Sequence, residues 1–131
     1  MTPRTFPFEF EPIYAAAALP FGVTPRTAAV VLDNRTFSAR FGAWSVRTPV
    51  ENLAGAEATG PYSPLKTIGP AHLSFADRGL TFATNRRRGA CIRFRDPVAG
   101  LVPSSALRHP ALTVTVADVD GLCRAVEELT S

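Results

Sequence analysis

The chain lacks the marks of several protein classes. Its only cysteines are Cys91 and Cys123, so a disulfide framework is excluded. No apolar stretch approaches the roughly 20 residues that a membrane-spanning helix needs. There is also no glycine-rich phosphate loop and no dinucleotide fingerprint. The sequence therefore does not read as a disulfide-rich scaffold, a helical membrane protein or a nucleotide-binding fold with a known signature.

The N-terminus does not resemble a signal peptide. The run Ala15–Leu19 has the small apolar residues of such a segment, but Glu9 and Glu11 stand where its apolar core should begin. Only Arg4 represents the basic start. We expect a cytoplasmic protein.

Histidine is scarce, and this argues against a metal site. His72 and His109 are far apart, and neither has a second ligand at metal-binding spacing. His109 stands between Arg108 and Pro110, a context that predicts a surface loop. We predict neither a metal nor another cofactor.

Nucleophilic residues are present without the partners that would activate them. Ser104–Ser105, His109 and Asp96 contain the residue types of a catalytic triad, but no strained nucleophile turn surrounds the serines. Cys91 would need a base beside it, and Cys123 falls on the apolar face of a predicted helix. The sequence predicts no catalytic residue, and we expect a protein that is not an enzyme.

What the chain does contain is typical of one β-rich domain. Its 131 residues suffice for a single hydrophobic core, and 46% hydrophobic with 19% charged residues argues against general disorder. Its 12 prolines favour short strands and extended connections over long helices.

The clearest pattern is a predicted three-strand meander over Leu73–Phe94. A tight turn at Asp77-Arg78-Gly79 separates the first two strands, and Asn85–Gly89 separates the second from the third. The side chains predicted to face the core at period two are Leu73, Phe75, Leu80, Phe82, Ala90, Ile92 and Phe94.

The N-terminal half predicts an edge segment, a short helix and several strands. Phe6, Phe8 and Phe10 alternate with other residues, as in an extended edge segment. A short helix is expected over Glu11–Leu19. The predicted strands are Thr27–Leu32, Thr36–Phe41, Ala43–Thr48 and, as a weaker strand or a bend, Glu51–Thr59.

The remaining segments predict loops, a last strand and a helix. Gly60–Pro64 reads as a corner within the domain. The segments Asp96–Gly100 and Pro103–Pro110 read as irregular connections, and Leu112–Val116 as a strand. Asp118 is expected to cap a C-terminal helix whose apolar stripe comprises Val119, Leu122, Cys123, Val126 and Leu129.

This order of elements resembles the pleckstrin-homology-like (PH-like) fold, especially its small bacterial members. The resemblance covers Thr27 to Thr130. It is carried by Phe41-Gly42-Ala43-Trp44, by Thr48-Pro49, and by Leu112–Val116 running directly into Ala117-Asp118. It implies a mainly β fold with one C-terminal α-helix, either a small antiparallel β-barrel or two bent sheets of about seven strands capped by the helix.

The resemblance also implies a role. PH-like domains generally bind lipid headgroups, peptides or neighbouring subunits and generally lack enzymatic activity. In lipid-binding members a basic loop joins the first two strands, whereas here that connection is the short Leu32–Arg35. We expect residues 1–26 to form an extended arm or short helix packed on a single domain of residues 27–131.

Positive charge is concentrated in the middle of the chain. Between Asn34 and Arg95 the sequence has ten basic residues and only three acidic ones. A basic hairpin loop, Arg86, Arg87 and Arg88, is extended by Arg93 and Arg95 if Cys91 and these two arginines share the outer face of a strand. Such a strip would bind phosphate or an acidic peptide. The alternative is a solvated turn whose charges protect the sheet from aggregation.

Aromatic residues leave the partner open. Tyr62 is either a plug over one end of the barrel or an exposed recognition residue, and Trp44 is expected in the core. Nucleic-acid binding is disfavoured, because Phe82 and Phe94 are predicted to face the core.

We therefore expect a non-catalytic binding or scaffolding module for a protein partner or an anionic surface. The alternatives are a small-molecule carrier or enzyme that uses the barrel mouth, and a self-associating structural domain, for which a homodimer is one form.

Overall fold

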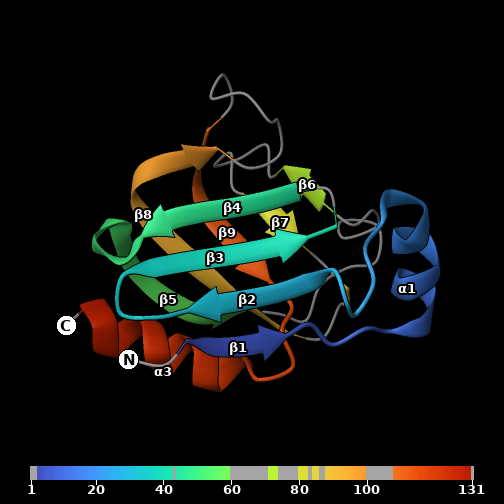
Figure 1. Cartoon of the computed structure of the whole chain (residues 1–131), viewed down its shortest axis with the longest axis horizontal. Coiled ribbons are helices and arrows are strands. Elements are labelled where there is room, and N and C mark those ends of the chain that lie inside the picture. The colour runs from blue at the N-terminus through green and yellow to red at the C-terminus, as the bar shows by residue number, and fades with distance from the viewer. Residues whose placement is uncertain are drawn as a thin grey trace.

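The computed structural model describes residues 3–42, 44–59, 71–73, 80–82, 84–85, 88–99 and 108–130. Within them the chain forms nine strands, two α-helices and two short 3-10 helices (Figure 1). The strands are β1 (Arg4–Pro7), β2 (Ala28–Leu32), β3 (Thr36–Phe41), β4 (Trp44–Pro49), β5 (Leu53–Thr59), β6 (Ala71–Leu73), β7 (Leu80–Phe82), β8 (Gly89–Ala99) and β9 (Arg108–Val114). The helices are α1 (Pro12–Ala18), η1 (Leu19–Phe21), η2 (Val50–Asn52) and α3 (Val119–Thr130).

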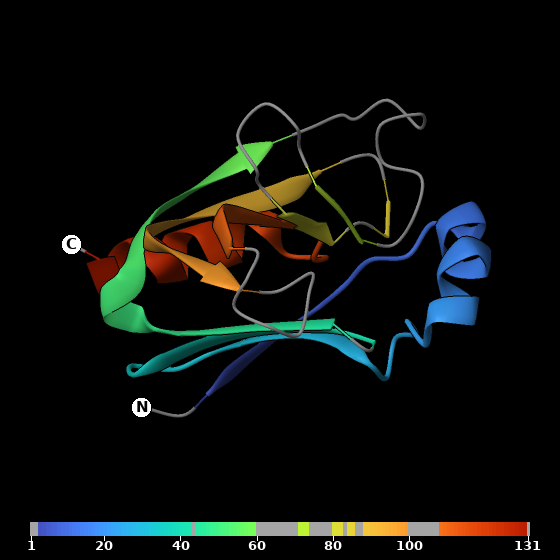
Figure 2. The ribbon, with the colours of Figure 1, turned by 90° about the horizontal axis from the view of Figure 1, so that it is seen from above.

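The strands form two sheets. The first is antiparallel, with the order β1-β2-β3-β4, and the second has the order β5-β8-β9-β7-β6. The two sheets lie as layers that meet at the turn from β4 through η2 into β5 (Figure 2). The prediction of a mainly β fold with a C-terminal helix is confirmed. Of the two predicted forms, the described strands adopt the two sheets. One isolated antiparallel bridge, between Phe8 and Val116, links the sheets, but the described strands do not close into a barrel.

One core fills the space between the sheets. Phe41 of the first sheet stacks on Phe82 of the second, with ring centroids 4.8 Å apart and planes at 5°. Phe8 packs on the same ring from the N-terminal segment, at 5.1 Å. Trp44, which we expected in the core, is only half-buried and packs against the core residues from outside.

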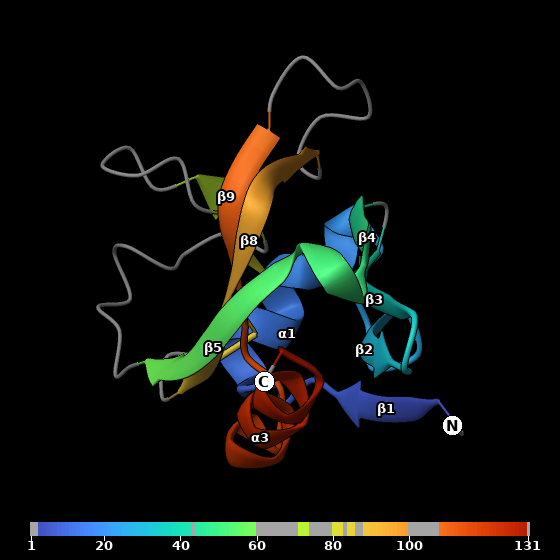
Figure 3. The ribbon, with the colours of Figure 1, turned by 90° about the vertical axis from the view of Figure 1, so that its left-hand side faces the viewer.

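The C-terminal helix follows the predicted pattern. Val119, Leu122 and Val126 enter the common core, while Cys123 and Leu129 are partly buried against it. Figure 3 shows α3 beside β1 and β5, away from β4 and the end of β8. None of the described helices is long and apolar enough to cross a membrane.

The N-terminal predictions are confirmed element by element. Phe6 and Phe8 are buried, and β1 pairs antiparallel with β2 as an edge strand of the first sheet. The expected short helix is α1. The division of the chain at residue 26 stays a prediction, although β1 is a full strand of the sheet.

The predicted meander is wrong in its order. The β6–β7 hairpin exists, with Leu73 opposite Leu80, but β7 does not neighbour β8. Strand β9 lies between them, parallel to β7 and antiparallel to β8. Alternation identifies which face of a strand is buried but not which strand lies beside it. Phe75 and the turn Asp77-Arg78-Gly79 lie outside the described residues.

Two predicted connections are also wrong in part. Strand β8 continues to Ala99, and β9 already begins at Arg108. Between Arg93 and Val98 the register of β8 shifts against β9, so the ladder is interrupted there. Pro97 and Pro110 both fall at this interruption, where a missing N–H costs no ladder bond. The predicted corner Gly60–Pro64 lies outside the described part of the chain.

His109 is not a surface residue. It is 1% exposed and sits in β9 opposite Val98. Arg108 and Pro110, which suggested a loop, belong instead to the start of β9. Its partner strand β8 is bulged at this point.

Candidate binding site

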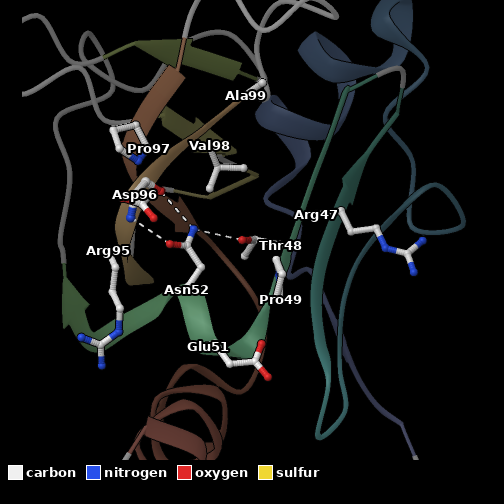
Figure 4. A pocket seen from close by; sticks show the side chains of 10 residues that line it. All are labelled: Arg47, Thr48, Pro49, Glu51, Asn52, Arg95, Asp96, Pro97, Val98 and Ala99. Carbon is white, nitrogen blue, oxygen red and sulfur yellow. Dashed lines mark hydrogen bonds between the residues drawn. The ribbon is translucent and has the colours of Figure 1, made fainter.

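A cleft opens where the end of β4 approaches the second half of β8. We call it the β4–β8 cleft; its volume is about 580 Å³. Its lining residues come from both sheets and from η2: Arg47, Thr48, Pro49, Glu51, Asn52, Arg95, Asp96, Pro97, Val98 and Ala99 (Figure 4).

Asn52 holds the two sides of the cleft together. Its side-chain amide donates hydrogen bonds to Thr48 Oγ1 and to the Asp96 carbonyl, each at 3.0 Å. Its carbonyl oxygen accepts a hydrogen bond from the Asp96 N–H at 2.8 Å. The side chain thus satisfies both backbone groups of Asp96, as a neighbouring strand would. These three hydrogen bonds hold η2, the end of β4 and the bent part of β8 in place around the cleft.

The bend of β8 gives the cleft its shape. Because the register shifts between Arg93 and Val98, residues 94–97 of β8 do not pair with β9. Asp96 in this stretch bonds to the Asn52 side chain instead. Pro97 and Val98 then form an apolar part of the wall. The sequence reads here as a proline-containing connection, so the cleft could not be predicted.

Charged groups stand at the rims of the cleft. Figure 4 shows the Arg47 and Arg95 side chains extending outward on opposite sides. Among the described residues neither arginine has a carboxylate at ion-pair distance. Glu51 and Asp96 also line the cleft, so its own charge is balanced. The site presents two guanidinium groups, two carboxylates and an apolar wall.

The predicted basic strip is only partly brought together. Cys91, Arg93 and Arg95 do share the outer face of β8, as expected. Arg93 forms an ion pair with Glu57, Nη1 to Oε1 at 3.3 Å. Arg95 lines the β4–β8 cleft instead.

Arg88 is engaged by the C-terminal helix. Its Nη2 and Nη1 atoms donate to the two carboxylate oxygens of Asp120, at 2.8 and 3.3 Å. This bidentate contact lowers the pKa of Asp120 and raises that of Arg88. The predicted Arg86, Arg87 and Tyr62 lie outside the described residues, so their roles stay predictions.

The remaining reactive residues do not gather into a site. Burial raises the pKa of the Cys123 thiol, which keeps it protonated at neutral pH. In the part of the chain that the structure describes, no group of three or more His, Cys, Asp or Glu residues is placed to hold a metal ion. Ser104 and Ser105 fall outside that part.

A buried polar cluster fixes the other end of the β-structure. Thr84 N–H donates to Thr115 Oγ1 at 2.7 Å, and Thr84 Oγ1 donates to the Glu9 carbonyl at 2.6 Å. Asn85 Nδ2 donates to the same carbonyl at 2.8 Å. These bonds join the N-terminal segment to the residues after β7 and β9.

Comparison with known proteins identifies no relative. No protein-family profile, curated protein or solved structure matches the chain.

Proposed function

We propose that the chain is a non-catalytic binding module of PH-like type that holds a protein partner at the β4–β8 cleft. The resemblance is supported by the four-stranded first sheet, the corner at η2 and the C-terminal helix. The parallel β7–β9 pair and the larger second sheet depart from the pattern on which the resemblance rests.

One observation carries the proposal. Asn52 fixes the bent β8 opposite the end of β4, so a recess with polar and apolar walls exists before any partner arrives. Binding to a preformed site avoids the cost of ordering it. The mixed, open lining suits a peptide better than a small molecule, which favours an enclosed and mainly apolar pocket.

An anionic surface is the second candidate, through the basic hairpin loop. Two described members of the strip weaken this candidate, because Arg88 and Arg93 already have carboxylate partners. An anionic ligand would have to displace Asp120 and Glu57 or use the remaining arginines.

Selection of random peptides displayed on phage against the purified protein tests the proposal. Peptides that bind should lose affinity for a Pro97→Trp variant, since Pro97 is exposed and lines the cleft. Pro7→Trp, at an exposed proline of β1, is the matched control and should bind like the wild type.

Two results would contradict the cleft proposal. One is a set of peptides that binds both variants equally. The other is the absence of binding peptides together with salt-sensitive binding to anionic vesicles that an Arg86/Arg87/Arg88→Ala variant loses, which would favour the anionic-surface candidate.

A further inference from the structure

Among the residues that the structure describes, one edge of β4 has no strand beside it. In the described first sheet β4 has one neighbour, β3. The Val50 N–H donates to the Arg35 carbonyl at 2.9 Å, and the β3–β4 register continues from this pair. Bonded and non-bonded pairs alternate along an antiparallel ladder. Ser45 and Arg47 therefore direct their N–H and C=O groups away from β3.

The opposite edge of the same sheet is less available. The Gly42 N–H donates to the Thr27 carbonyl at 3.0 Å, and this pair fixes which residues of β2 bond to β3. Carried over to the β1–β2 register, the alternation directs the backbone groups of Thr5 and Pro7 away from β2. Pro7 has no N–H to offer. On β4, Pro49 also lies at a position that points away from β3 but has no N–H, so the outward N–H groups of this edge are those of Ser45 and Arg47.

The outer face of the first sheet carries two of its arginines, Arg40 and Arg47, whereas Arg4 lies on the same face of β1 as the buried Phe6. Strands β1 to β4 contain three arginines and no aspartate or glutamate. The Arg4 guanidinium lies over the Phe6 ring, 5.3 Å from its centroid. Arg40 and Arg47 are exposed on the outer face, opposite Ser45 and Ser38 respectively.

We infer that the partner is an extended acidic segment that adds to the sheet at the β4 edge. Its backbone pairs with Ser45 and Arg47, and its acidic side chains lie on the outer face beside Arg47. Directly paired residues bring their Cβ atoms to roughly 5 Å, within reach of an ion pair. The alternate side chains turn inward to the cleft, where Pro97 and Val98 offer an apolar wall. This inference rests on the proposed function and specifies its ligand.

A fluorescent peptide with the sequence Glu-Val-Glu-Val-Glu-Val-Glu provides the probe, and its lysine counterpart is the control. The wild type should bind the acidic peptide and not the basic one. Ser45→Pro removes an outward N–H at an edge position that tolerates proline, and the lost pairing should weaken binding about tenfold. Thr5→Pro, the equivalent change on the β1 edge, should leave binding unchanged.

Charge reversal supplies a second, independent variant. Arg47→Glu, at an exposed side chain, should weaken binding of the acidic peptide and improve binding of the basic one. This variant keeps the inference testable if Ser45→Pro fails to fold, which circular dichroism would reveal.

The outcomes separate the inference from the proposed function. Loss of binding in Pro97→Trp with full binding in Ser45→Pro would overturn strand addition and leave a cleft-binding module. Equal binding of acidic and basic peptides would overturn the acidic partner. A wild-type dimer that Ser45→Pro converts to a monomer would assign the edge to a second copy of this chain and overturn the inference.

Discussion

Asn52 joins two segments that lie far apart in the sequence. Its amide bonds to Thr48 nearby and to the backbone of Asp96 across the cleft. Nothing in the local sequence predicts such a bond, because its geometry arises only when η2 and β8 have packed. The rims of the site contain Arg95, which was predicted from charge, and Arg47, which was not.

Replacing Asn52 with alanine should destabilise the protein. The Asp96 N–H and C=O would lose their partner, and the free energy of unfolding should fall by about 1–3 kcal/mol. Urea denaturation measures this change. Asn34→Ala is the control, at an exposed asparagine in the β2–β3 turn. Equal stability of the two variants would contradict the role given to Asn52.

The Arg88–Asp120 ion pair should set part of the acid sensitivity of the fold. Hydrogen bonding from Arg88 lowers the pKa of Asp120 below its ordinary value of 3.8. A carboxyl with a lowered folded pKa stabilises the fold above its unfolded pKa, and this contribution is lost as the pH falls through the folded pKa. In Arg88→Ala the Asp120 pKa should rise toward 3.8.

A carbon-13 NMR titration of Asp120 measures this shift. Urea unfolding should also show that the stability difference between Arg88→Ala and the wild type shrinks below pH 3.8. An unchanged Asp120 pKa in the variant would rule out the ion pair in solution.

At the scale of elements, the start of α3 depends on a close contact. The Asp118 carboxylate accepts a hydrogen bond from the Gly121 N–H at 3.0 Å. A Cβ atom at Gly121 would meet that carboxylate. Gly121 therefore allows the cap to form, although glycine normally weakens a helix.

Gly121→Ala should lower stability despite the higher helix propensity of alanine. In an Asp118→Ala background the same change should be neutral or stabilising, by up to about 1 kcal/mol, because the contact is gone. Thermal unfolding of the four proteins gives this double-mutant cycle. Additive effects would show that the cap does not constrain Gly121.

The buried hydrogen bonds around Thr115 should also contribute to stability. Thr115→Val removes the acceptor of the Thr84 N–H and leaves a buried donor unpaired, with an expected loss of about 1–3 kcal/mol. Thr113→Val, two residues earlier on the same strand and half-buried, is the control. Denaturant unfolding that ranks the two variants equally would contradict this role.

Sequence pattern predicted most strands but not their neighbours. Period-two alternation placed Ala90, Ile92 and Phe94 correctly in the core. It could not place β9 between β7 and β8, because the order of strands depends on contacts between distant segments, such as Thr115 with Phe82. The buried His109 was missed for the same reason, since the bulge that encloses it forms between two strands.

At the scale of the whole molecule, two sheets meet along the η2 side and enclose one core. Helix α3 lies beside β1 and β5, and the polar cluster holds the N-terminal segment. The region between the free edge of β4 and the bent β8 is where we propose that a partner binds. Its backbone groups at Ser45 and Arg47 point toward this region, as the register requires.

Amide hydrogen exchange, followed by NMR in the free protein and with saturating acidic peptide, tests the account most directly. We predict that the Ser45 and Arg47 amides exchange more slowly when the peptide is bound, while the Thr5 amide on the other edge does not change. Unchanged exchange at Ser45 and Arg47 in the peptide-saturated protein would contradict the proposal that the partner adds to β4.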